Sequence, residues 1–498
     1  MPKKIAIRIV NLLWYGTALL IVLAAMAVAI GRELMPHINL GSEPVSRYAS
    51  QRTGADISIK NLRGQWIRFF PEFVVSEIDV NTPAAQVHAT NIHVDVDVFR
   101  SLLLRTPVFD RLEVAGARVS LGTNTDNPDI DLEKLWSTVY LLLNNNIHIS
   151  NVDIDFPHTG PQQTEPQRQL HIADFRVEQR LLEKRFFLRI PGAAPGESLA
   201  ITGSLNGTTL AASAGNLYIN MHNWQIDQWL PATNENTPPV LRQILGSSWQ
   251  TSGESWISWE GIDKLTSITK VELQHNISSI GSSNNDKTVI ALPDTISSFF
   301  SADWQRNNGS TLHIQQLQLH NRDTQIDAVQ NAVIHFRDTA SWRLQAPKLS
   351  LDNLSALVGF LPDNTLKSVL SSLHPSGDLD NLDLQWDNNQ PLATRMQLRA
   401  NASNLATGPW SGVPAFTKVS GYLQSGINYG FIDLESRDGF SMFYPGIYHE
   451  PLMFQTAAGR VQWHWLPEEK TVLVGSDHAR LTGEAGDADG NFWLYLPL

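Results

Sequence analysis

The chain contains no cysteine in its 498 residues. This absence excludes disulfide bonds, thiolate nucleophiles and cysteine-ligated metals. It leaves the compartment open, because a chain without thiols can function in an oxidising or a reducing environment.

Positive charge is also scarce. The chain has 37 lysines and arginines against 49 aspartates and glutamates, which gives a formal net charge of −12. A nucleic-acid-binding protein needs a basic face to neutralise phosphates. We therefore expect no nucleic-acid partner.

Catalytic signatures are missing. The sequence has no Gly-x-Ser-x-Gly elbow, no Gly-rich phosphate loop with Lys-Ser/Thr and no His-Glu-x-x-His motif. The side chains that could bind a cation fall within alternating strand patterns, which produce such spacings by themselves: His148, His171, His275, His313, and the pairs Asp95/Asp97 and Asp153/Asp155. We therefore expect no enzymatic activity, no catalytic residue, no metal site and no cofactor.

One long segment is free of charge. Residues 12–31 read LLWYGTALLIVLAAMAVAIG, and about 20 apolar residues in a helix cross a bilayer core of about 30 Å. Basic residues are concentrated before this run, which predicts a cytoplasmic N-terminus over residues 1–10 and a membrane-spanning helix over 11–33. The expected anchor residues are Trp14, Tyr15, Leu19, Leu20, Ile21 and Leu23. A cleaved signal peptide fits less well, because the run is long and lacks a small-x-small cleavage site; a buried soluble helix is a third interpretation.

The rest of the chain reads mainly as β-strands. Residues 92–98 alternate apolar and polar side chains with a period of two, which is typical of a sheet with one apolar and one polar face. We expect a linker over 34–55 with a short helix over 45–51, and a first β region over 56–230 that includes a helix at 131–144. A second β region with short helices is expected over 231–375. A third is expected over 376–498, and we expect it to continue beyond residue 498 in a longer protein.

A shorter motif, apolar-x-apolar-x-x-apolar, recurs along the chain. Its two-residue skip shifts the side-chain phase by one, as happens at a bulge or bend that turns a strand. Repeated in neighbouring strands, such a bend would curl the sheet into a trough; the alternative is two short strands joined by a tight turn. The motif occurs at Ile57/Ile59/Leu62, Phe73/Val75/Ile78, Ile147/Ile149/Val152, Leu170/Ile172/Phe175, Leu312/Ile314/Leu317 and Leu349/Leu351/Leu354.

The apolar strand faces need a covering layer, and the expected helices are too few to supply it. Leaving about 1,000 Å² of apolar surface in water would forgo about 25 kcal/mol. Either two sheets stack face to face, or one curved sheet surrounds a groove with apolar contents such as lipid acyl chains. The residues expected to line such a groove near the membrane are Ile92, Val94, Val96, Val98, Leu112, Val114, Ile147 and Ile149.

Several short segments resemble the YhdP branch of the AsmA-like proteins, from the expected anchor to the end of the chain. At the N-terminal end these are Met35-Pro36-His37-Ile38, residues 53–59 (TGADISI), residues 62–66 (LRGQW), Phe70-Pro71 and residues 96–103 (VDVFRSLL). At the C-terminal end they are residues 419–422 (VSGY), 434–437 (LESR), 443–445 (FYP) and 459–463 (GRVQW). Each segment is weak alone, and their order and spacing carry the resemblance.

The resemblance implies a bridge-like lipid carrier of the Gram-negative envelope. Such a protein is anchored in the inner membrane by one N-terminal helix, has its bulk in the periplasm, and carries phospholipid toward the outer membrane along a curved antiparallel β-groove. Its partners would be phospholipid, the inner membrane, and outer-membrane or periplasmic proteins. Two alternatives stay open: an anchored scaffold or regulator of envelope assembly with a self-packed β core, and an anchored periplasmic hydrolase.

Overall fold

The computed structural model describes most strands of the chain and part of its N-terminal segment. The described residues are 15, 18, 21–22, 25–26, 28–33, 35, 42–53, 55–67, 70–82, 85–98, 100–101, 108–122, 145–156, 169–180, 183–207, 209–226, 248–275, 293–321, 324–338, 340–353, 370–409, 414–445, 447–469, 471–484 and 486–497. They divide into two compact units, Met1–Ile219 and Asn220–Leu498.

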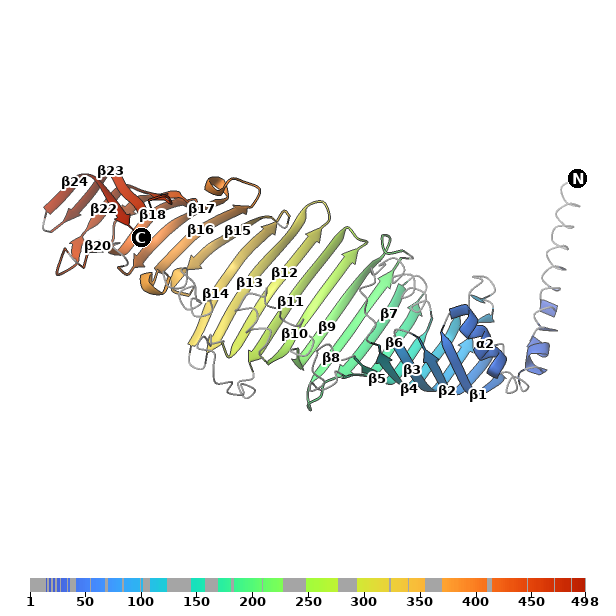
Figure 1. Ribbon diagram of the computed structural model, residues 1–498. Helices are drawn as coiled ribbons and strands as arrows, with labels where there is room; N and C mark the ends of the chain where they lie inside the picture. Colours follow the sequence, from blue (N-terminus) through green and yellow to red (C-terminus); the bar gives the residue numbers. More distant parts are fainter. Residues whose placement is uncertain are drawn as a thin grey trace, which may run out of the picture. The chain divides into compact units, whose positions relative to one another are not determined.

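The first unit is an open sheet whose strands follow the chain order (Figure 1). Neighbouring strands pair antiparallel, except β4 and β5, which run parallel. Its elements are α2 (Ser42–Thr53), β1 (Asp56–Ile67), β2 (Phe70–Asn81), β3 (Ala85–Val96), β4 (Phe109–Leu121), β5 (Ile147–Asp155), β6 (Gln169–Arg180), β7 (Glu183–Pro191) and β8 (Ser198–Asn206). The boundary between the units falls within β9 (Ala214–Gln225).

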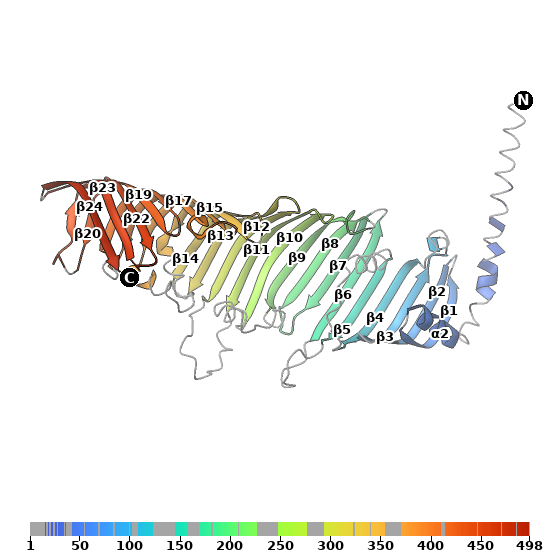
Figure 2. The ribbon, with the colours of Figure 1, turned by 45° about the horizontal axis from the view of Figure 1, so that its top comes forward.

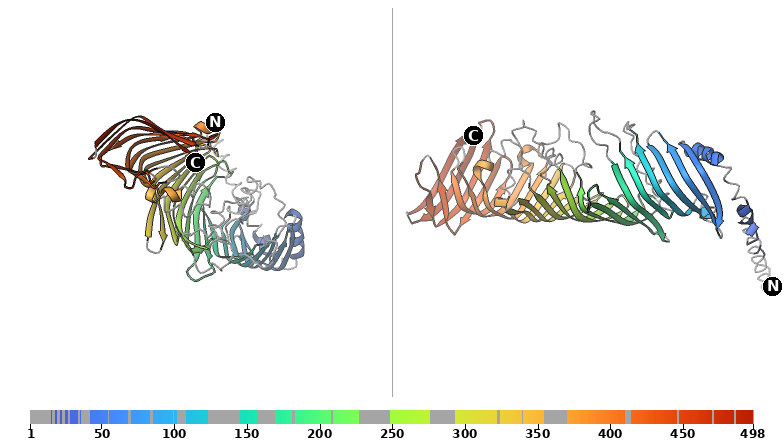
Figure 3. Two further views of the ribbon diagram at one scale, coloured as in Figure 1. Left: turned by 60° about the vertical axis from the view of Figure 1, so that its left-hand side comes forward. Right: turned by 90° about the horizontal axis from the view of Figure 1, so that it is seen from below.

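A row of left-handed residues bends the strands of the first unit at one level. Asn61, Asn91 and Asn151 have φ between 52° and 55°, and Gly116 has φ 128°. Asparagine and glycine are the residues that adopt this conformation most readily. The strands stay in register across the bend, since Lys60 pairs with Glu77 and Leu62 with Val75. Neighbouring strands therefore bend together, and Figure 3 shows the resulting curvature.

The short helix α2 covers part of the free edge of β1. The backbone N–H groups of Ile57 and Ile59 donate to Ser50 Oγ at 2.9 Å and to Ser46 Oγ at 3.0 Å. These side chains replace the missing neighbouring strand and protect an edge that could otherwise pair with another chain. The helix expected over 45–51 is thus confirmed.

The second unit is a longer antiparallel sheet that forks near its end. Strands β10 to β18 pair in chain order (Figure 2). The C-terminal half of β18 then pairs with β19, and its N-terminal half pairs with β20. Beyond the fork, β19 pairs with β22, followed by β23 and β24, while β20 pairs with β21. Its elements are β10 (Trp249–Glu260), β11 (Lys264–His275), β12 (Thr295–Gln305), β13 (Gly309–Asn321), β14 (Thr324–Phe336), β15 (Ser341–Ser350), β16 (Ser376–Asp387), η5 (Leu392–Thr394), β17 (Met396–Thr407), β18 (Ala415–Ser425), β19 (Tyr429–Ser436), β20 (Phe440–Phe443), β21 (Leu452–Phe454), β22 (Thr456–Leu466), β23 (Thr471–Gly483) and β24 (Gly486–Pro497).

The structure confirms a mainly β chain with few, short helices and strands that continue across the two-residue skip. In β1, β2, β5, β6 and β13 the motif lies within one strand. Only in β13 is it a bulge with a register shift: against β12, Phe299 pairs with Gln316 and Phe300 with Ile314, which leaves Gln315 as the extra residue. The motif at Leu349/Leu351/Leu354 was wrongly expected to be a strand throughout, because β15 ends at Ser350 and residues 351–353 are helical.

The predicted anchor is described only in part. Tyr15 and Ile21 lie in helical positions and are 75% and 61% exposed, whereas Trp14, Leu19, Leu20 and Leu23 lie outside the described residues. Within the described part of the chain, we find no helix with the length and apolar character that crossing a bilayer requires. The helix expected at 131–144 also lies outside the described residues.

The last described turn of the N-terminal helical segment contacts the sheet. A Cβ atom at Gly31 would lie 2.2 Å from the indole ring of Trp66 in β1. Because glycine has no side chain, the helix backbone can approach the ring.

Candidate functional site

One face of the first unit carries continuous rows of apolar side chains, which we call the apolar face. Its central row crosses eight strands through direct cross-strand neighbours: Leu62, Val75, Ile92, Val114, Ile149, Phe175, Leu188 and Ile201. A second row runs beside it through Phe73, Val94, Leu112, Ile147, Val177 and Phe186. The two-residue skip in the sequence shifts the alternation by one residue at the bend. Apolar side chains therefore stay on this face on both sides of the bend.

The apolar face is packed sideways within the sheet. Leu62, Val75, Ala89 and Ile92 form a buried cluster, and half-buried neighbours such as Val94 and Val114 surround it. Among the described elements, the main contacts join strands that neighbour each other in the sheet, and α2 with β1. In the part of the chain that the structure describes, no second sheet lies over this face. The face thus presents half-buried apolar side chains such as Val114, Ile149 and Phe175 beside buried ones such as Ile147 and Val177.

The structure brings most of the predicted lining residues together. Ile92, Val94, Leu112, Val114, Ile147 and Ile149 occupy adjacent positions on the apolar face. Val96 is half-buried at the end of β3, where the register shifts and it pairs with Phe109. Val98 differs from the prediction: it lies beyond the end of β3 at a helical position and is 39% exposed.

The opposite face of the first unit carries ion pairs. Arg111 Nε donates to Asp95 Oδ2 at 2.9 Å, and its Nη2 lies 3.4 Å from Glu72 Oε1. The hydrogen bond to Asp95 raises the pKa of Arg111 above its ordinary value. The charged side chains make this face suitable for contact with water. The two apolar rows of the opposite face contain no charged residue.

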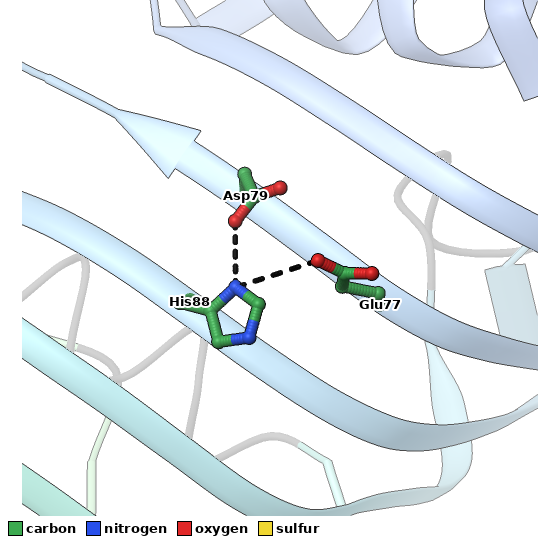
Figure 4. A group of neighbouring side chains, drawn as sticks. All are labelled: Glu77, Asp79 and His88. Carbon is green, nitrogen blue, oxygen red and sulfur yellow. Dashed lines mark hydrogen bonds and ion pairs between the residues drawn. The ribbon is translucent and has the colours of Figure 1, made fainter.

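One cluster on the polar face brings together three potential metal ligands, Glu77, Asp79 and His88 (Figure 4). His88 Nδ1 lies 2.6 Å from Asp79 Oδ1 and 3.9 Å from Glu77 Oε1. The ammonium group of Lys60 already contacts both carboxylates, at 2.9 Å and 3.7 Å. It supplies the positive charge that a metal would bring, so we interpret the cluster as an ion-pair network. The sequence hint was the Glu-x-Asp spacing opposite a histidine on the neighbouring strand.

Sequence reasoning missed a buried lysine beside the apolar face. Lys184 pairs with Leu205 across β7 and β8, and only 3% of its surface is exposed. Burial lowers its pKa from 10.5 to about 8. A cation held this close to half-exposed apolar side chains could contact an anionic group of an amphipathic ligand.

Comparison with known proteins supports the resemblance noted in the sequence. No curated protein matches this chain. The family model described as YhdP protein matches residues 1–486, nearly the whole chain. This chain therefore belongs to the YhdP family.

Proposed function

We propose that this chain is an inner-membrane-anchored lipid-transfer protein of the periplasm. Its apolar face would shield phospholipid acyl chains while the headgroups stay in water. The observation that carries the proposal is the pair of apolar rows across the first unit, over which no described layer of protein packs. Family membership agrees with this function.

The physical basis is mutual burial of apolar surface. Each methylene transferred from water to an apolar surface gains about 0.8 kcal/mol. An acyl chain lying across the half-buried Val114, Ile149 and Phe175 would remove both its own surface and that of the side chains from water. Because the rows continue from strand to strand with similar side chains, neighbouring positions would bind a chain about equally well, which permits sliding.

In this proposal the protein is passive and not an enzyme. The sequence has no energy-coupling or catalytic motif, so no bond is made or broken and the direction of transfer is set elsewhere. The uncharged run at residues 12–31 would span the inner membrane with the N-terminus in the cytoplasm. Phospholipid and the inner membrane are the proposed partners, together with outer-membrane or periplasmic proteins that receive the lipid.

Photo-crosslinking in cells tests the proposal. A photoreactive residue is placed at Val96 or Val114, and the matched control is at Glu113, the neighbour of Val114 on the opposite face. We expect phospholipid adducts at Val96 and Val114 and few at Glu113. Adducts to protein, or no adducts, at Val96 and Val114 would overturn the proposal in favour of an envelope scaffold.

A further inference from the structure

The N-terminal edge of the first unit is bordered by two different helical segments. α2 lies along the half of β1 that contains Ile57 and Ile59, whose backbone N–H groups donate to two serines of the helix (Figure 1). The last described turn of the N-terminal helical segment contacts the other half, where Gly31 meets the indole ring of Trp66. The two halves of this edge therefore have different neighbours.

The side chains of β1 do not by themselves distinguish the two halves. Ile57 and Ile59 lie on the apolar face before the bend at Asn61, and Leu62 and Trp66 lie on it after the bend. Ile57, Ile59 and Trp66 are all half-buried. What distinguishes the halves is the helical segment beside each of them.

The helix α2 is a polar neighbour. Its sequence, SEPVSRYASQRT, contains few apolar residues, and the exposed side chains of Glu43 and Arg47 form an ion pair of 3.1 Å. An acyl chain that crossed the edge beside α2 would meet charged and hydrogen-bonding groups, so it would bury little of its own surface there. The α2 half of the edge is therefore a poor path for a lipid chain.

The N-terminal helical segment leads to an apolar path. It contains the end of the uncharged run at residues 12–31, and the last residue of that run is the glycine that contacts Trp66. The next pair inward from Trp66 is Gly64 with Phe73, which begins the second apolar row, and Leu62 then begins the central row. Uncharged positions thus continue from the end of the run to both rows of the apolar face.

We propose that phospholipid enters the apolar face at Trp66, where its acyl chains pass from the bilayer along the N-terminal helical segment onto β1. The indole ring would be the first part of the sheet that the chains contact. Tryptophan suits this position because its ring binds apolar groups at the boundary of a bilayer. α2 would close the other half of the edge. The inference rests on the proposed lipid-transfer function and adds the place of entry.

Photo-crosslinking in cells at three positions of β1 tests this entry site. The full chain carries a photoreactive residue at Trp66, at Ile57 on the same face beside α2, or at Ile67 on the opposite face. Ile67 is the matched control, because it is the neighbour of Trp66 and is 48% exposed. We expect phospholipid adducts at Trp66 to exceed those at Ile57 and Ile67 by about tenfold, as for a difference of about two methylenes in contact.

A charge at the entry site gives a second measurement. Trp66→Glu should lower the yield of phospholipid adducts at Val114 by about tenfold, because an acyl chain that passes a carboxylate strips water from it. Trp66→Phe keeps an apolar ring and should stay within about twofold of the parent. The control Ile67→Glu places the same charge on the opposite face and should also stay within about twofold. Melting temperatures verify that the variants fold; if Trp66→Glu does not, the adduct pattern along β1 decides the outcome.

The outcomes separate the entry site from the proposed function. Equal adduct yields at Trp66 and Ile57, or at Trp66 and Ile67, with lipid adducts still formed at Val114, would refute the entry site alone. An unchanged yield at Val114 in a folded Trp66→Glu variant would do the same. Absence of phospholipid adducts at Val114 in the parent chain would also refute the proposed function.

Discussion

Gly116 and Asn151 lie at the same level of two neighbouring strands, and both have a positive φ. Ala115 pairs with Ser150 and Ala117 with Val152, so the two residues occupy the intervening position. Their φ angles are 128° and 55°. The bend that continues the apolar face across β4 and β5 therefore depends on backbone conformations that most residues avoid.

Substitution of Asn151 should separate backbone from side-chain effects. Asn151 is exposed, so its replacement removes little packing. Asn151→Val should destabilise the chain by about 1–2 kcal/mol because a β-branched residue is strained at positive φ, whereas Asn151→Gly should be nearly neutral. Urea unfolding measures both, and Ser150→Val, at an ordinary strand position, is the control. Equal stability of the valine and glycine variants would contradict the account.

The buried Lys184 should give the chain an alkaline dependence of stability. Its pKa is lowered to about 8 in the folded state, below the ordinary 10.5. Between these values the unfolded chain binds more protons than the folded one, so the stability contributed by this group rises as pH increases from 8 to 10.5. Lys184→Met should remove that rise, by about 3 kcal/mol in all. Urea unfolding at pH 7 and pH 10 compares the two proteins, and parallel pH profiles would refute the assignment.

Asp383 should contribute more stability than a similar but more exposed carboxylate. The hydrogen bond from Arg343 lowers the pKa of Asp383, whose side chain is 19% exposed. Because the pKa of Asp383 is lowered in the folded state, its ionised form stabilises the fold at pH values above the pKa of the unfolded chain, about 4. This stabilisation is lost as the pH falls through the lower pKa of the folded state. Asp383→Asn should cost about 1–2 kcal/mol at pH 7 and weaken the acid dependence.

The control for that change is Asp433, which Arg460 also engages through two hydrogen bonds. Its side chain is 43% exposed, so solvent screens the pair. Asp433→Asn should cost no more than about 0.5 kcal/mol. Equal losses at the two positions would mean that burial does not control the strength of these pairs.

The approach of Gly31 to Trp66 predicts coupling between the N-terminal helical segment and β1. Gly31→Val places a side chain where the indole ring lies and should lower the melting temperature when Trp66 is present. In a Trp66→Ala background the same change should have little effect, which gives a coupling energy of about 0.5 kcal/mol or more. Additive effects in the double-mutant cycle would show that the two residues do not interact.

The sequence predicts the β character of the first unit and the shared face of its apolar residues because both follow from local periodicity. Ile92, Val94, Leu112 and Val114 follow a period of two, which places them on one face of any sheet. The skip in the pattern also predicted a bend. Its mechanism was not predicted, although an asparagine directly before an apolar residue, as at Asn61, Asn91 and Asn151, is a usable signal for it.

Features that depend on distant neighbours could not be predicted. Val98 continues the alternation of β3 in sequence, but β3 ends at Val96. Leu351 continues the pattern of β15, but the strand ends at Ser350. The burial of Lys184 depends on which strands become neighbours. Periodicity within one strand does not contain that information.

The most direct test of the central claim is a photo-crosslinking scan along β4. The apolar face takes Leu112 and Val114 before the bend at Gly116, and Ala117 and Val119 after it. If acyl chains lie on this face, phospholipid adducts should peak at these four positions and fall at Glu113 and Arg118, with the alternation shifting phase at Gly116. Uniform yields, or peaks on the polar face, would contradict the account.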